Sequence, residues 1–178
     1  SLIASGIVTF ISSVFLLSSN EIKDMISLWQ IKSIYKTKSE MNSKANNYLE
    51  NAKTKIDIIA IGMTNYISAR GDVLKEKSQN GVKIRIISCK SNEMLLQREK
   101  DEAVNITRNP TGKLKEEVLD LYKWVDNLKF AGCDISLRFH DTYPGFSYLR
   151  IDDHIFWGPN LPLKKSQQNI AFEFYLYR

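Results

Sequence analysis

The first twenty residues contain no charged side chain, and this constrains the chain more than any other feature of its sequence. The segment Leu2–Leu17 consists almost entirely of apolar or small residues. A helix of about twenty residues is about 30 Å long, which matches the hydrocarbon core of a bilayer. A buried core helix and a cleaved signal peptide are the alternatives, but the run lacks a polar stripe, a basic start and a small-residue cleavage site. The sequence therefore predicts a transmembrane helix over residues 1–20.

The charges that follow this run predict its orientation. Between Glu21 and Lys55 there are seven lysines against four acidic residues. Because basic residues concentrate on the cytoplasmic side of membrane spans, we expect an inner-membrane protein whose C-terminal domain lies in the cytoplasm. The two cysteines, Cys89 and Cys133, are too few for a disulfide framework and lack the spacing of metal ligands. We expect neither a metal nor a cofactor.

Residues 21–54 carry apolar side chains at spacings of three and four, which predicts a long amphipathic connector helix or two shorter helices. Trp29 and Tyr35, with lysines between them, suit either a membrane surface or a partner subunit. Packing on a partner is the favoured interpretation. The folded domain is then expected over residues 55–178.

The pattern of that domain predicts an α/β fold with a mixed sheet. Expected strands cover residues 56–61, 82–87, 134–139, 146–151, 154–157 and 169–175, and expected helices cover 69–78 and 113–130. The order strand–helix–strand at the start predicts a parallel pair, and Asp152-Asp153 predicts the turn of a hairpin. A net charge of +5 favours anionic partners, such as lipid headgroups, nucleotides or nucleic acid.

The segment Leu137–Asn160, LRFHDTYPGFSYLRIDDHIFWGPN, resembles the core of a phospholipase D-like half-domain. Residues 56–88 are similar to the first β-α-β unit of the same fold, so the resemblance extends over residues 55–178. It implies a mixed sheet of the phospholipase D-like type. It also implies a homodimer or a higher assembly, because enzymes of this family build one active site from two such halves.

The catalytic residues of that family are missing from this chain. Its active members carry a His-x-Lys pair, then an Asp, ahead of a Gly-Ser-x-Asn turn, and the His attacks phosphorus while Lys and Asn hold the phosphate oxygens. Here the Asp matches Asp152 or Asp153. The positions of the His and the Lys then hold Gly145 and Ser147, or Phe146 and Tyr148. His140 lies too early and His154 too late. We therefore expect a protein that is not an enzyme of this mechanism.

The resemblance still implies a phosphate-binding rim. Its predicted ligand-binding residues are Ser147, Arg150, Asp152, Asp153, His154, Asn160, Lys164 and Lys165. A second basic group near the end of the second strand comprises Lys83, Arg85, Lys90 and Arg98, where open α/β sheets tend to bind ligands. The alternatives are a hairpin turn at Asp152-Asp153 with Arg150 as its ion-pair partner, and a solvated face for the second group.

These features together predict a membrane-anchored, non-enzymatic effector. Its degenerate phospholipase D-like domain would sense a phosphorylated ligand, a nucleic acid or a nucleoprotein partner. The layout resembles membrane-disrupting toxins of bacterial anti-phage defence, of the retron or CRISPR-signalling type. One alternative is a membrane-bound phosphodiesterase or nuclease that uses His140 or His154. Another is a membrane-tethered scaffold that binds a protein through an exposed apolar patch.

Overall fold

The structure is a computed structural model that describes residues 20–24, 26–90, 113–142, 144–161 and 166–176. Residues 20–24 and 26–28 are helical. The further elements are β1 (Ile31–Tyr35), α2 (Lys38–Glu50), β2 (Lys55–Ile59), α3 (Thr64–Gln79), β3 (Lys83–Cys89), α5 (Lys113–Phe130), β4 (Ile135–His140), β5 (Phe146–Ile151), β6 (His154–Pro159), a 3-10 turn (Ser166–Gln168) and β7 (Ala171–Tyr175).

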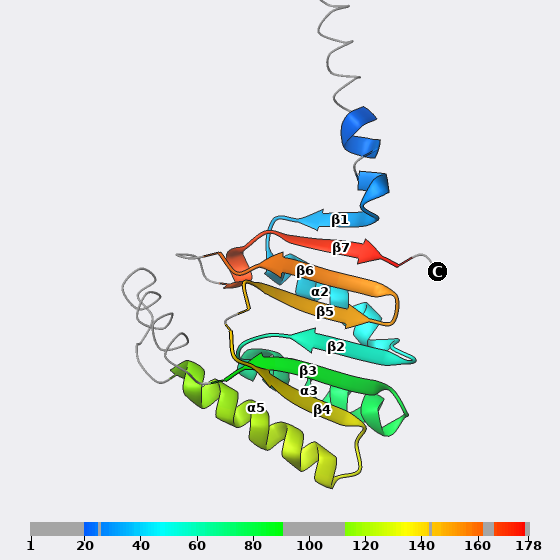
Figure 1. Cartoon of the computed structure of the whole chain (residues 1–178). Helices are drawn as coiled ribbons and strands as arrows, with labels where there is room; N and C mark the ends of the chain where they lie inside the picture. The colour runs from blue at the N-terminus through cyan, green and yellow to red at the C-terminus, as the bar shows by residue number, and fades with distance from the viewer. Residues whose placement is uncertain (1–19, 25, 91–112, 143, 162–165, 177–178) are drawn as a thin grey trace, which may run out of the picture.

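The seven strands form one mixed sheet in the order β1-β7-β6-β5-β2-β3-β4 (Figure 1). Strands β2, β3 and β4 are parallel, because α3 and α5 provide the long crossovers that parallel neighbours need. The other neighbours are antiparallel, and a two-residue turn at Asp152-Asp153 joins β5 to β6. The predicted parallel pair and the predicted hairpin are thus confirmed.

The hydrophobic core lies on one face of the sheet, where α2 and α3 are seen behind the strands (Figure 1). Residues at alternate positions of the strands, such as Ile56, Ile84 and Phe156, are completely buried there. Leu49 of α2 and Leu121 of α5 belong to the same core. Burying one such side chain stabilises the folded state by about 1.5–3 kcal/mol, so the many buried side chains on this face are a main source of its stability.

The predicted transmembrane helix is not supported. No helix among the described residues is long and apolar enough to cross a membrane. The predicted span lies outside the described residues except for Asn20, and the helical residues that follow it carry the charges of Glu21, Lys23 and Asp24, which a bilayer core disfavours. The predicted fold class is therefore corrected to a mixed α/β sheet, with no such helix among residues 20–24, 26–90, 113–142, 144–161 and 166–176. The inner-membrane localisation, which depended on the helix, is wrong as well.

The predicted long amphipathic helix is also wrong, because a strand interrupts it. Gln30 has a positive φ of 56°, and the next five residues form β1, which pairs with β7. A separate helix, α2, begins after Thr37, whose hydroxyl accepts the backbone N–H of Glu40. Strand β1 joins the common sheet and α2 joins the common core, so both belong to the same packed unit as the residues after Lys55.

Candidate functional site

A pocket of about 590 Å³ opens beside the ends of β2, β5 and β6, between α2 and the first turn of α3. Hydroxyl and amide side chains dominate its lining. They are Ser39, Asn42, Ser43, Asn46, Thr64, Asn65, Ser147, Asn160, Ser166, Gln167 and Asn169. Arg70 and Glu117 also line it. We call this the polar pocket; it lies where open α/β sheets tend to bind ligands, outside the carboxyl end of a parallel strand.

The N-terminus of α3 lies at the polar pocket together with the carboxylate of Glu117, which is placed against Gly62. Residues Gly62 to Tyr66 line it, and the helix begins after Met63, which makes no side-chain capping bond. The first turn of α3 also contains no acidic residue. Since the first N–H groups of a helix have no partner within the helix and carry a partial positive charge, this end favours an anion.

Lys38 provides a buried amine that contacts two lining residues of this pocket, although Lys38 itself does not line it. The residue is only 4% exposed, and its Nζ donates to Asn160 Oδ1 at 2.7 Å and to Ser166 Oγ at 3.2 Å. Burial lowers the pKa of the amine from 10.5 to about 8. Both partners are uncharged, so the ammonium is held by neutral oxygens that themselves line the pocket. A buried cation without a counter-ion is costly, and an arriving anion would relieve that cost.

Gly158 makes room for this lysine. A Cβ atom at residue 158 would lie 2.8 Å from Lys38 Cε and 3.0 Å from the carbonyl oxygen of Ile170. No larger residue fits there without displacing the lysine or the backbone. The glycine of β6 thus has a packing reason that concerns the pocket.

Asn169 is the second unusual group at the pocket. It is 1% exposed, and neither its side-chain oxygen nor its side-chain nitrogen has a hydrogen-bond partner. Its backbone carbonyl accepts the N–H of Lys38 at 2.8 Å, which fixes the residue beside the lysine. Buried amides are nearly always hydrogen-bonded in folded proteins, so this one marks a place where a water molecule or a ligand group would supply the missing partner.

Two of the predicted site residues, Ser147 and Asn160, line the polar pocket. Ser147 Oγ donates to the carbonyl of Gly158 at 3.3 Å, and Asn160 Nδ2 donates to the carbonyl of Pro144 at 3.0 Å. The antiparallel pairing of β5 with β6 brings these residues together, since the first residues of β5 face the last residues of β6.

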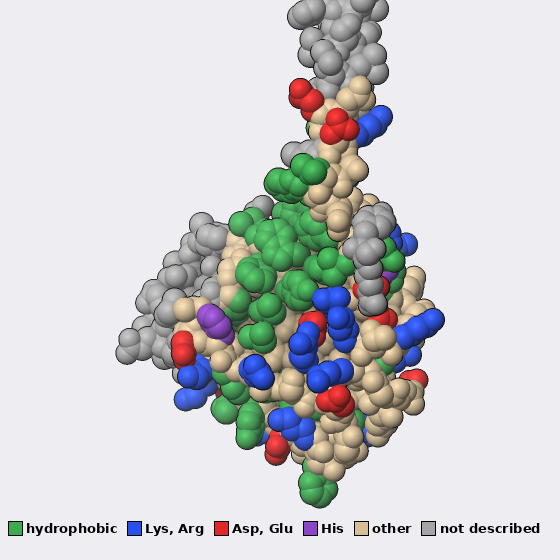
Figure 2. All heavy atoms as spheres, turned by 45° about the vertical axis from the view of Figure 1, so that its right-hand side comes forward, with side chains coloured by type: hydrophobic (Ala, Val, Ile, Leu, Met, Phe, Trp, Pro, Cys, Tyr) green, Lys and Arg blue, Asp and Glu red, His purple; other side chains and the backbone are tan. Residues whose placement is uncertain are grey.

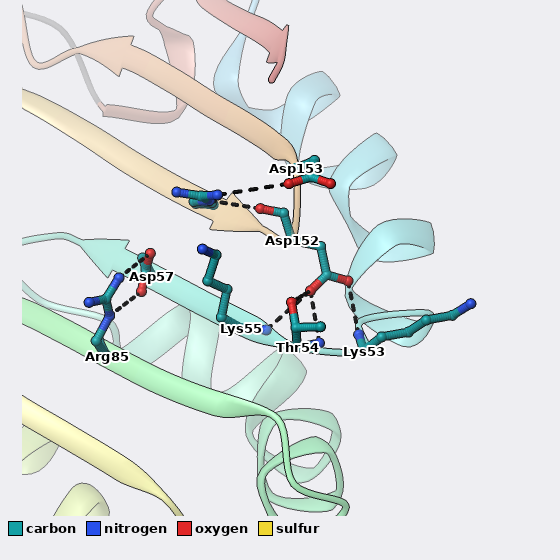
Figure 3. A network of polar contacts seen from close by, with 8 residues as sticks. Lys53, Thr54, Lys55, Asp57, Arg85, Asp152 and Asp153 are labelled. Carbon is teal, nitrogen blue, oxygen red and sulfur yellow. Dashed lines mark hydrogen bonds and ion pairs between the residues drawn. The ribbon is translucent and has the colours of Figure 1, made fainter. Parts of the chain in front are cut away.

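Arg150, Asp152 and Asp153 lie at the other end of this hairpin (Figure 3). The Asp152 carboxylate accepts the backbone N–H groups of Lys53, Thr54 and Lys55 at 2.9–3.1 Å and the Thr54 hydroxyl at 2.6 Å. Burial alone would raise the pKa of this carboxyl, but these hydrogen bonds outweigh it and lower the pKa. Asp152 therefore clasps the hairpin turn to the start of β2.

Arg150 completes the turn rather than the pocket. Its Nε donates to the carbonyl of Asp152 at 2.7 Å, and its Nη2 lies 3.9 Å from Asp153 Oδ1. These contacts match the alternative interpretation, in which the two aspartates form a turn and Arg150 is their partner. The structure does not bring these three residues to Ser147 and Asn160.

His154 belongs to a third location, beneath α2. Its ring lies 4.0 Å from the ring of Tyr48, and its Nδ1 is 3.3 Å from Oε1 of the completely buried Glu173. Glu173 also accepts the Tyr35 hydroxyl at 2.5 Å and pairs with Lys32 at 3.1 Å. The histidine is thus part of a buried polar network that holds α2 on the sheet.

Two of the three described residues of the second basic group, Arg85 and Lys90, are paired with acids. Arg85 makes a two-pronged ion pair with Asp57 at 2.6 and 2.7 Å (Figure 3). Lys90 Nζ lies 2.7 Å from Asp141 Oδ1. Lys83, the first residue of β3, is exposed. Arg98 of this group, and Lys164 and Lys165 of the rim, lie outside the described residues.

Lys38 and Asn169 escaped the sequence analysis. The signature Thr37-Lys-Ser-Glu40, a hydroxyl three residues before a glutamate, marks the start of α2 and could have placed Lys38 in its first turn. Nothing local predicts its contact with Asn160, which is 122 residues away. Within the described ranges, no group of three or more His, Cys, Asp or Glu residues could hold a metal ion. The pocket can therefore bind through an amine, amides, hydroxyls and helix N–H groups.

Comparison with known proteins gives no family. No family model and no curated protein matches the chain. Similar solved structures include TrmBL2, an archaeal chromatin protein whose structure is described as showing a novel mode of DNA binding, at 14% identity and a TM-score of 0.47 over 93% of this chain. They also include NucT from Helicobacter pylori, at 16% identity and a TM-score of 0.46 over 79% of this chain and 82% of that one. The chain spans 57% of the TrmBL2 chain, and at these scores neither likeness carries a functional assignment.

Proposed function

We propose that this domain is a binding module that recognises a phosphorylated ligand in the polar pocket. The observation that supports it best is the buried Lys38 amine, held by the neutral oxygens of Asn160 and Ser166. A phosphate group would supply the counter-ion that the Lys38 ammonium lacks among these two partners. Charge-assisted hydrogen bonds of this kind are about twice as strong as neutral ones.

The neighbouring donors suit the same group. The first turn of α3 offers backbone N–H groups to an anion, and the unpartnered amide of Asn169 offers a donor and an acceptor. Ser147 and Asn160, which the resemblance to phospholipase D-like proteins places at a phosphate, line the same pocket. The ligand's phosphate is therefore expected near Lys38, with its remainder over the hydroxyls and amides of α2.

The phosphate has two possible sources, a free nucleotide or other small phosphate ester, and the backbone of a nucleic acid. A cavity of about 590 Å³ falls within the about 300–1,000 Å³ range of small-molecule sites. The net charge of +5 suits either source, since both are anions. The two share the chemistry of recognition, so the experiment must separate them.

Binding without hydrolysis is part of the proposal. Gly145 and Ser147, or Phe146 and Tyr148, stand where a phospholipase D-like enzyme has its His-x-Lys pair. The enzyme alternative would need His140 or His154. His154 lies beneath α2 with Tyr48 and Glu173, and His140 Nδ1 accepts the backbone N–H of Thr142, so neither favours that alternative. Because no described helix spans a membrane, the proposal contains no membrane step.

The test measures ligand-induced stabilisation in the full chain. Melting temperatures are recorded with pyrophosphate, AMP and a short single-stranded oligonucleotide, for the wild type, Lys38→Met and Lys44→Met. Lys44 is exposed on the same helix, so its variant is the matched control. A ligand at a hundred times its Kd contributes about 2.7 kcal/mol, a shift of several degrees. The shift should occur in the wild type and in Lys44→Met and disappear in Lys38→Met.

The same measurement identifies the source of the phosphate. A shift with AMP indicates a small ligand, whereas a shift with the oligonucleotide alone indicates nucleic acid. Gly158→Ala serves as a second variant, because its methyl group would displace the lysine side chain without removing the amine. Equal shifts in the wild type and Lys38→Met would overturn the proposal, as would no shift with any of the three compounds.

A further inference from the structure

The face of the sheet opposite the core is uncovered within the described ranges, and we call it the open face. Successive side chains of a strand alternate between the two faces, so the neighbours of the buried Ile56, Ile84 and Phe156 point to this side. Apolar and aromatic side chains occupy its half over β1, β7 and β6, and basic side chains occupy its half over β5, β2, β3 and β4. Figure 2 shows apolar side chains gathered beside a cluster of Lys and Arg.

The basic half carries five cations against one acid at the strand positions that point to this side. The cations are Lys55, Lys83, Arg85, Arg138 and Arg150, and the acid is Asp57. Arg85 is paired with Asp57, and Arg150 lies 3.9 Å from Asp153 of the adjoining turn. The side chains of Lys55, Lys83 and Arg138 make no ion pair with any residue that the structure describes. The surplus of positive charge is therefore complementary to a polyanion.

Two of these unpaired cations face each other. Lys55 of β2 and Lys83 of β3 occupy paired positions in the parallel register, and Figure 3 shows Lys55 close to the Asp57–Arg85 pair. Like charges directly opposite each other on neighbouring strands are destabilising. A phosphate bound between the two ammonium groups would relieve this repulsion.

Aromatic rings border the basic half. Tyr148, Trp157 and Phe172 occupy paired positions on β5, β6 and β7. The ring centroids of Trp157 and Phe172 are 5.6 Å apart, and those of Phe146 and Trp157 are 6.3 Å apart. All four rings are at least partly exposed. Exposed rings on a sheet are surfaces on which unpaired bases stack, two or three bases on one sheet in RNA-binding domains.

We propose that the open face binds a single-stranded nucleic acid. Its bases stack on the four rings, and its phosphates contact Lys55, Lys83 and Arg138. The strands from β7 to β4 together extend about 24 Å, so one nucleic-acid strand that crosses them reaches both halves. A duplex suits this face less well, because its bases are already stacked on one another. The inference goes beyond the proposed function, since the polar pocket lies beside α2 and α3 on the other side of the sheet.

The test measures the affinity of the full chain for labelled oligonucleotides of about 12 nucleotides by fluorescence anisotropy. Single-stranded RNA, single-stranded DNA and a DNA duplex are compared, and a preference for RNA would indicate contact with the 2′-hydroxyl. Trp157→Leu keeps an apolar side chain but removes the stacking surface. Phe146→Ala repeats the test at a position that is already 37% exposed, in case Trp157→Leu does not fold.

Each of these two variants should bind the single strand about 5- to 150-fold more weakly than the wild type, which is the effect of losing one stacked base. Phe130→Ala is the matched control, because Phe130 is 97% exposed at the end of α5. It should bind as the wild type does. An acidic protein as the natural occupant would not require stacking, so unchanged oligonucleotide affinity in folded Trp157→Leu and Phe146→Ala overturns the proposal.

The cations are tested through the dependence of affinity on salt. The double variant Lys83→Gln, Arg138→Gln removes two phosphate contacts. It should reduce the slope of log affinity against log salt by about 1.4, since each contact with a single strand contributes about 0.7. A double variant with Lys44→Gln and Lys75→Gln removes two exposed lysines from α2 and α3 and is the control. Equal losses in the two double variants would overturn the open face as the site.

The outcomes also separate this surface from the polar pocket. Lys38→Met should still bind the single strand, and the open-face variants should keep the pyrophosphate-induced thermal shift. Binding lost only in Lys38→Met would assign the nucleic acid to the pocket and overturn the present inference. Oligonucleotide binding without a pyrophosphate shift would overturn the pocket and leave the open face standing. A duplex bound as tightly as the single strand, or no binding at about 50 mM salt, would overturn the single strand as occupant.

Discussion

The two faces of the sheet carry similar residues but have different surroundings. On the covered face, Ile56, Ile84 and Phe156 are completely buried under α2, α3 and α5. Ile87 of β3 and Phe172 of β7 point to the opposite face of the sheet, because successive side chains of a strand alternate between its two faces. Both of these side chains remain at least partly exposed. The described helices therefore cover only one of the two faces of the sheet. Apolar residues on both faces are typical of sheets that are covered on both sides, and within the described ranges only one face of this sheet is covered.

The largest effect that could break this comparison is a truncation in the covered face. Phe156→Ala should cost about 3–5 kcal/mol, because a completely buried ring leaves a cavity. Phe172→Ala, on the opposite face of the neighbouring strand, should cost less, because that ring is only partly buried. Urea denaturation at low protein concentration measures both losses. Similar losses of unfolding free energy in the two variants would show that Phe172 is as deeply buried as Phe156.

Lys38 gives the covered side an unusual pH dependence. Its pKa is about 8 in the folded protein and 10.5 as a model value, so the unfolded chain binds the extra proton between these values. Stability from this group should therefore rise from pH 8 to pH 10.5, by at most about 3 kcal/mol. Denaturation curves at several pH values should show this rise in the wild type and in Lys44→Met. Its persistence in Lys38→Met would exclude Lys38 as its source.

Asp152, at the turn between β5 and β6, should show a dependence of the same sign in the acid range, because its pKa is also lowered in the folded protein. Its folded pKa is lowered, so its contribution is present above the unfolded value of 3.8 and disappears as the pH falls through the folded pKa. Asp152→Ala should cost about 2 kcal/mol at pH 7, since three backbone N–H groups lose their acceptor. The difference from the wild type should shrink in acid, and a difference that stays constant down to pH 2 would contradict the assignment.

The smallest expected effect concerns the end of the helix that covers the core. Thr37→Ala removes the cap of α2 and should cost about 1 kcal/mol. Because Lys38 follows the cap directly, the same change should also weaken pyrophosphate binding, whereas Thr37→Ser should restore both. A loss of stability with full ligand affinity would show that the cap does not position the lysine.

Local pattern predicted much of this fold. Helix α5 was predicted over its full length because Leu114, Val118 and Leu121 repeat every three to four residues on a buried face. Strand β1 was missed because its five residues, IKSIY, lie within a longer run of helix-like spacings. Helix α3 starts at Thr64 rather than at Ala69, because its cap, Met63, carries no side-chain signal.

The site was less accessible to prediction than the fold. The family resemblance led to Ser147 and Asn160, which do line the polar pocket. It also led to Asp152 and His154, which the structure places in a turn and in a buried network. Their closeness in the sequence could not separate these residues, because β5 and β6 both run along the sheet. The hairpin places Ser147 and Asn160 at its open end and Asp152 at its turn. The contact of Lys38 with Asn160 depends on the whole fold.

The pairing of β1 with β7 has a consequence for synthesis on the ribosome. The first and last strands described are neighbours at the edge of the sheet, about 140 residues apart in the chain. Contacts between such distant segments form late. Because synthesis begins at the N-terminus, β1 leaves the ribosome long before β7, the strand with which it pairs. Lys38 meets Asn160 and Ser166 only after those residues have left the exit tunnel. The proposed ligand site can therefore assemble only after residue 166 has emerged, and a nascent fragment that stops before residue 160 lacks it.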